Sequence, residues 1–89
     1  MIDVTKLDEQ LNSLRGLDFE AAEVQERAAG NNFPDVTFSK SFQARLAAIA
    51  LGIPADEIKT LPLKQYNQAC QRVFNFLFAN SDDATPVTN

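Results

Sequence analysis

The feature that most constrains the fold of this chain is a series of apolar residues at helical spacing over residues 38–78, interrupted by two short proline-containing breaks. A Gly-Ile-Pro run at residues 52–54 ends one helical pattern, and a Leu-Pro pair at residues 61–62 precedes the next. Glycine tolerates the left-handed backbone that ends a helix, and proline suits the first turn of a new one. No alternation typical of a β-strand lasts beyond a few residues. The pattern therefore predicts an all-α fold.

We expect a small bundle of four to five helices that forms a single domain over residues 1–80. Within this domain, residues 1–30 are expected to form acidic front helices and residues 36–80 the core. A loop rich in glycine, asparagine and proline separates the two halves. Residues 81–89 are polar and contain a proline, so we expect them to form a disordered tail.

Each helix is expected to bury one apolar stripe. At about 100° per residue, apolar side chains three or four positions apart share one face of a helix. A short helix that begins near Pro54 is expected between the two longer helices of the back half. The stripes expected to face the core are Val4, Leu7, Leu11 and Leu14; Leu17, Ala21, Val24 and Ala28; Phe38, Phe42, Leu46 and Ile49; and Leu63, Tyr66, Cys70, Val73, Phe74, Leu77 and Phe78.

The last helix carries more apolar surface than a single stripe. Phe76 lies near the angular positions of Ala69 and Val73, so including it widens the apolar surface to roughly 200°. Large apolar patches on small proteins usually mark interfaces, which makes Phe76 and Phe78, with Val73 and Ala69, candidate contacts for another chain. A second interpretation stays open, in which the helix is central and packs front-half helices on one side and the Phe42 helix on the other.

The composition removes most of the groups that catalysis needs. The chain has 89 residues, with no histidine, no tryptophan and a single cysteine, Cys70. The commonest general base and metal ligand is therefore missing, and no internal disulfide can form. Cys70 lies on an inner stripe and is expected to be a buried small hydrophobe, not a nucleophile. We expect a binding protein, not an enzyme, with no catalytic residue, cofactor or metal.

The charge and hydropathy of the chain restrict its partners. The net charge is -4, which repels phosphates, and no cluster of lysine and arginine interrupts it, so no nucleic-acid partner is expected. No apolar run approaches the roughly 20 residues needed to span a bilayer, so no membrane partner is expected either. The first residues lack the pattern of a signal peptide. We expect a cytoplasmic protein.

The charges are unevenly distributed along the chain. Residues 1–35 carry eight acids and three bases, net -5, whereas residues 36–80 carry two acids and five bases, net +3. Two aspartates in the tail bring the sum back to -4. The acidic front half can pack on the basic back half, or the two can form separate solvated surfaces, and the sequence leaves both interpretations open.

A longer pattern runs from Phe42 to Leu77. A helix ends in Gly-Ile-Pro, a short acidic helix follows that begins at Pro54 and runs to about residue 59, and Leu61-Pro62 leads into a helix with Tyr66 early and a Phe-Leu pair late. This pattern, over about half the chain, resembles small tail assembly chaperones of long-tailed bacteriophages and prophages. Residues 1–30 match no part of that family, whose members often begin with an extended segment where this chain has helical patterns.

The resemblance implies a nonenzymatic protein of the host bacterial cytoplasm that is absent from the mature virion. It implies binding to the tape measure protein, which such chaperones keep soluble until tail tube subunits polymerise around it. It also implies self-association and a longer frameshifted form of the same chain. Two other functions stay open: a small structural virion protein, such as a connector or tail completion protein, and an acidic adaptor that mimics DNA.

Overall fold

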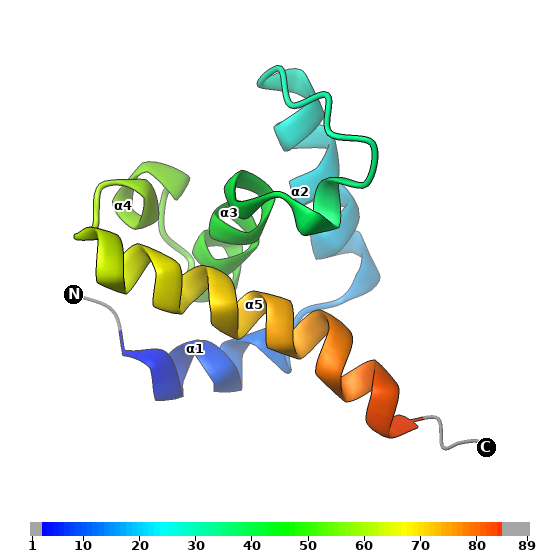
Figure 1. The fold of residues 1–89 in the computed structure, drawn as a ribbon, viewed down its shortest axis with the longest axis vertical. Helices are drawn as coiled ribbons and strands as arrows, with labels where there is room; N and C mark the ends of the chain where they lie inside the picture. The colour runs from blue at the N-terminus through cyan, green and yellow to red at the C-terminus, as the bar shows by residue number, and fades with distance from the viewer. Residues whose placement is uncertain (1–2, 85–89) are drawn as a thin grey trace.

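The computed structural model describes residues 3–84, of which residue 4 and residues 79–84 are described by their backbone alone. Over this range the chain forms helices and no strand, and the expected all-α class is confirmed (Figure 1). The elements are α1 (Val4–Leu11), α2 (Gly16–Ala28), the short 3₁₀ helix η1 (Val36–Phe38), α3 (Lys40–Leu51), α4 (Ala55–Lys59) and α5 (Leu63–Ala84).

The centre of the fold is α3, not the last helix as the sequence suggested. It packs against η1 and each of the other α-helices, whereas α5 packs mainly against α1, α3 and α4. The reason lies in the composition of α3, because Phe42 and Leu46 alternate with the small buried residues Ala44, Ala47 and Ala48. Alanines on several faces let neighbouring helices approach α3 from different directions. The large residues then fill the space between those helices.

The core is built from all parts of the described chain. Phe42 packs edge-on against Phe19 of α2, with ring centroids 5.2 Å apart. Of the inner residues expected for the first helix, Leu7 and Leu11 are completely buried, and Leu14, which follows α1, is partly buried and packs against the core. The largest fully buried side chains are Phe42, Leu7, Leu11, Leu46, Ile58, Val73 and Cys70.

Most helix boundaries follow the expected signals. Asp3 precedes α1, and its carboxylate accepts hydrogen bonds from the backbone N–H groups of Thr5 and Lys6. Gly52 ends α3 in the left-handed conformation, with φ 71°. Pro54 directly precedes α4 instead of occupying its first turn.

The end of α5 differs from the prediction. The helix continues to Ala84, past the expected end near residue 79, and so includes residues 81–84 of the expected disordered tail. The sequence contains no proline or glycine between Pro62 and Pro86, so no residue type in that stretch forces the helix to stop. The rest of the expected tail, residues 85–89, lies outside the described residues.

The orientation of α2 is the largest error of the sequence prediction. The stripe expected to face the core is on the outside: Leu17 is 74% exposed, Val24 is 66% exposed, and Ala21 and Ala28 are exposed as well. The opposite face, with Phe19, Ala22 and Glu26, packs on α3. Distant partners decide this orientation. Phe19 meets Phe42, Glu26 meets Arg45, and the small Ala22 lets α2 approach α3 closely.

Candidate protein-contact surface

Three phenylalanine rings gather on the outside of the molecule, where η1 meets α5. Phe38 of η1 stacks on Phe78 of α5, with ring centroids 5.0 Å apart and an angle of 7° between the ring planes. Phe74 lies one helical turn before Phe78, and the centroids of their two rings are 4.8 Å apart. Phe38 is 53% exposed and Phe74 is 37% exposed. We call these three residues the aromatic surface.

Hydrogen bonds around η1 fix the position of Phe38. The Asp35 carboxylate accepts hydrogen bonds from the backbone N–H and the hydroxyl of Thr37, and the Gln43 amide donates to the Thr37 carbonyl at 3.0 Å. Because α3 begins only at Lys40, Phe38 is not part of the inner stripe expected for that helix. Ser39, in an extended conformation, separates Phe38 from α3. The ring of Phe38 therefore packs on α5 instead.

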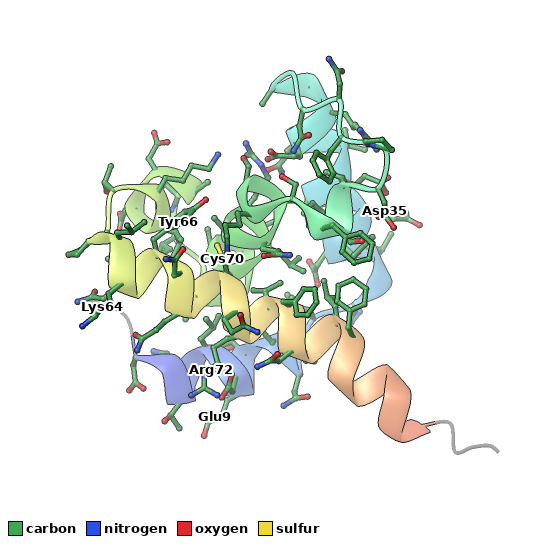
Figure 2. The ribbon with its side chains drawn as sticks, viewed as in Figure 1. Glu9, Asp35, Lys64, Tyr66, Cys70 and Arg72 are labelled. Carbon is green, nitrogen blue, oxygen red and sulfur yellow. The ribbon has the colours of Figure 1, made fainter. Side chains whose placement is uncertain are left out.

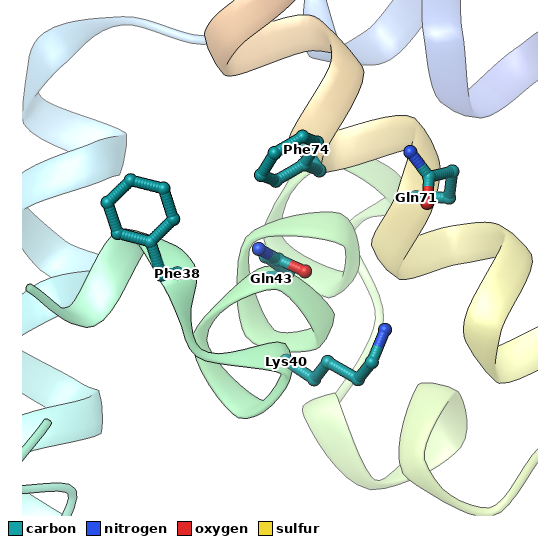
Figure 3. Close-up of a pocket in the computed structure, with 5 residues that line it drawn as sticks. All are labelled: Phe38, Lys40, Gln43, Gln71 and Phe74. Carbon is teal, nitrogen blue, oxygen red and sulfur yellow. The ribbon is translucent and has the colours of Figure 1, made fainter.

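An open pocket of about 250 Å³ adjoins the aromatic surface. Phe38, Phe74, Lys40, Gln43 and Gln71 line it (Figure 3). The two rings supply apolar walls, the two amides can donate and accept hydrogen bonds, and the lysine carries a positive charge. Sites for drug-sized ligands are clefts or cavities of roughly 300–1,000 Å³ that bury most of the ligand, so this smaller, open pocket better suits single side chains of a protein partner.

The four residues predicted to contact another chain have separate positions in the fold. Phe78 belongs to the aromatic surface. Phe76 is partly buried and packs against the core, and Ala69 and Val73 are completely buried, which leaves neither of these two accessible to a partner in this fold. The alternative interpretation of α5 is right that it packs between a front-half helix, α1, and the Phe42 helix, α3, although the centre of the fold is α3 and not α5.

Phe38 and Phe74 were missed because their spacing assigned them to inner stripes. Leu63, from the same expected stripe as Phe74, is 73% exposed. The signal that could have identified the surface is the number of phenylalanines at the end of the chain. Three of the seven phenylalanines lie between residues 74 and 78. Three rings so closely spaced cannot all be buried on a single face of a helix.

Comparison of the chain with protein-family models, curated proteins and solved structures found no match. Among residues 3–84, none of the helices has both the length and the apolar character needed to span a bilayer. No group of acidic or cysteine side chains suited to holding a metal ion occurs in the part of the chain that the structure describes.

A buried carboxylate joins α2 to α3. Glu26 is only 2% exposed, and one of its oxygens lies 2.8 Å from Arg45 Nε. The side-chain amide of Asn31 donates to the other oxygen at 2.8 Å and also to the Ser39 hydroxyl. Burial alone would raise the pKa of Glu26, but hydrogen bonds with Ser41, Arg45 and Asn31 outweigh it and lower the pKa to about 2. Glu26 is therefore ionised throughout the neutral range.

The described ion pairs link the acidic front half to the basic back half. Glu26 pairs with Arg45, and Asp8 pairs with Arg72 at 3.4 Å. The first pair is buried and the second is nearly half exposed, so removing one partner of the first pair costs more stability. The interpretation in which the acidic half packs on the basic half is confirmed for these contacts. Figure 2 shows Arg72 on α5 directed toward α1.

The expected burial of Cys70 is also confirmed, since the residue is completely buried. Its thiol lies 3.5 Å from the Lys40 carbonyl, to which it donates. Burial raises the pKa of the Cys70 thiol and, one turn earlier on α5, the pKa of the Tyr66 hydroxyl. Both groups are protonated at neutral pH, so Cys70 lacks the thiolate character of a nucleophile.

Proposed function

We propose that this chain is a tail assembly chaperone of a long-tailed bacteriophage or prophage, which binds the tape measure protein in the host cytoplasm and keeps it soluble until the tail tube forms. The observation that carries the proposal is the aromatic surface of Phe38, Phe74 and Phe78. Two exposed rings gathered beside a partly buried third ring favour contact with another apolar surface. A client helix that covers them removes its own apolar stripe from water at the same time.

The shape and chemistry of the surface favour a helical client. Phe74 and Phe78 are one turn apart on α5, and Phe38 stands beside them on η1, so together they form a short apolar track. A helix with apolar residues at positions i, i+3 and i+4 can lie along such a track. The polar groups around the pocket, including the Lys40 ammonium, suit polar and acidic residues that flank the client's stripe.

The stretch that carries the sequence resemblance borders the aromatic surface and includes Phe74, whereas Phe38 and Phe78 lie just outside it. The pattern from Phe42 to Leu77 covers α3, α4 and most of α5, and the aromatic surface lies at the junction of α5 with η1. In the proposed role the chain leaves the tail before the virion matures. A longer frameshifted form would share the same client surface.

We expect Phe74→Ser to weaken binding of the tape measure protein about tenfold or more, because exposed aromatic residues at the centre of interfaces often dominate affinity. Phe33→Ser is the matched control, since Phe33 is a 49% exposed phenylalanine in the loop before η1, outside the aromatic surface. The measurement is isothermal titration of each purified variant with a soluble tape measure segment. Circular dichroism should show equal helicity in the two variants.

Two results would count against this function. Equal binding by Phe74→Ser and Phe33→Ser would show that the client uses another surface. Mass spectrometry of purified virions is expected to find none of this chain. A stoichiometric amount there would instead support a small structural virion protein, such as a connector.

A further inference from the structure

The outward face of α2 is an apolar ridge formed by Leu17, Ala21, Val24 and Ala28. The four side chains fall within about 60° of one another around the helix, roughly opposite the face that packs on α3. Leu17 and Val24 are 74% and 66% exposed, which is unusual for two large apolar residues one above the other on a short helix. Figure 1 shows α2 projecting from the body formed by α1, α3 and α5, and the exposure of all four side chains makes the ridge accessible.

We propose that this ridge is a contact between two copies of the chain, which pair through antiparallel α2 helices across a twofold axis. The residues alternate in size, and the midpoint of the ridge lies between Ala22 and Glu23. Reversal about that point places Leu17 opposite Ala28 of the partner subunit, and Val24 opposite Ala21 of the partner subunit. Each large side chain therefore meets a small one, which allows close helix packing in both halves of the contact.

The charges beside the ridge favour the same arrangement. Glu20 and Arg27 lie on one edge of the ridge, about 20° apart around the helix. In an antiparallel pair the same edges meet, and Glu20 then lies about 3 Å along the axis from Arg27 of the partner subunit. The twofold symmetry gives two such Glu20–Arg27 attractions in the dimer. A parallel pair would instead bring Glu20 toward Asp18 of the partner subunit, where like charges repel.

Arg27 is already held in place for this role. Its guanidinium donates hydrogen bonds to the carbonyls of Asn31, Phe33 and Pro34 in the loop after α2. A guanidinium carries five N–H donors, so these contacts leave it able to attract a second acceptor. Because the side chain is ordered in the single chain, pairing costs less of its conformational entropy.

The size of the contact sets the expected strength of the dimer. Stable interfaces bury about 800 Å² on each partner, and one pair of short helices buries less. The dimer should therefore depend on concentration. The ridge on α2 is separate from the aromatic surface on η1 and α5, so the dimer does not depend on the proposed chaperone function.

The first experiment is sedimentation equilibrium of the full chain between about 10 µM and about 1 mM. The wild-type chain should shift from monomer to dimer, whereas Val24→Asp should remain monomeric with an unchanged circular dichroism spectrum, because Val24 makes little contact with the core. Phe33→Asp, an exposed apolar position outside the ridge, should dimerise like the wild type. A wild-type chain that is monomeric throughout, or a Val24→Asp variant that still dimerises, overturns the proposal.

A mixing experiment tests the direction of the helices. Glu20→Arg and Arg27→Glu each place like charges across the twofold axis, so each variant alone should dimerise roughly tenfold more weakly than the wild type. An equimolar mixture restores both attractive pairs and should form heterodimers by native mass spectrometry. Failure of the mixture to form more dimer than either variant alone overturns the antiparallel arrangement.

Because Arg27→Glu also removes the loop hydrogen bonds, the register needs a test that leaves Arg27 intact. Leu17→Cys and Ala28→Cys chains, mixed and oxidised, should form disulfides mainly between the two different variants. Disulfides mainly between identical variants, or none at all, contradict the proposed register.

Discussion

Glu26→Gln is expected to lower the free energy of unfolding by about 3 kcal/mol at neutral pH, because it leaves the Arg45 guanidinium without the buried carboxylate that neutralises it. This loss is a large part of the total free energy of unfolding of a small domain, which is typically about 5–15 kcal/mol. Urea unfolding followed by circular dichroism measures the loss. The matched control is Asp8→Asn, which breaks the more exposed pair with Arg72 and should cost about 0.5 kcal/mol or less.

The carboxylate of Glu26 also makes the free energy of unfolding depend on pH in the acidic range. The pKa of Glu26 is about 2 in the folded chain and 4.5 in its ordinary state. Because the folded value is the lower one, the unfolded state takes up a proton first as the pH falls. The stabilisation is therefore complete above about pH 5 and disappears as the pH approaches about 2, with a total on the order of 3 kcal/mol.

Glu26→Gln should consequently flatten the dependence of stability on pH over that acidic range. The measurement is a series of urea titrations at different pH values for the wild type and the variant. An equally steep acid loss in the variant would show that other carboxylates, and not Glu26, control the acid stability of the fold.

Phe76→Asp is expected to lower the free energy of unfolding by about 3 kcal/mol, because it replaces a ring that packs against the core with a charge that needs water. Thermal unfolding followed by circular dichroism should show a much lower midpoint. Phe74→Asp is the matched control on the same helix, and its more exposed ring should leave the fold nearly as stable as the wild type. A Phe76→Asp chain that keeps wild-type stability would return Phe76 to the list of candidate partner contacts.

The sequence predicted those parts of the fold that neighbouring residues determine. Gly52 ends α3 and Cys70 is buried, as local spacing and capping rules indicate, and Asp3 caps α1, where the local pattern offered Thr5 or Asp3. These features depend on residues within one or two turns of each other. Periodicity over a single helix is enough to identify them.

The errors arose where partners distant in sequence decide the outcome. Both faces of α2 carry apolar residues, and the ridge with Leu17 and Val24 is the more hydrophobic of the two. The contacts of Phe19 with Phe42 and of Glu26 with Arg45 nevertheless determine which face is buried. No pattern within α2 contains that information.

The candidate site was predicted in part for the same reason. The apolar excess at the end of the chain was visible in the sequence, and Phe78 was among the residues it indicated. The stacking of Phe38 on Phe78 depends on η1, which holds Phe38 outside the helix it was assigned to. Which phenylalanines face water therefore follows from the turn before α3, not from the periodicity of α5.

The separation of α2 from the aromatic surface has a consequence for how a long client is held. Two chains joined at α2 would carry two aromatic surfaces on one dimer. A client with apolar turns at suitable intervals would occupy both, and the second attachment would proceed at a high effective concentration. The affinity would then increase with the length of the client. A short fragment would dissociate quickly, whereas an extended client with several such turns would stay bound.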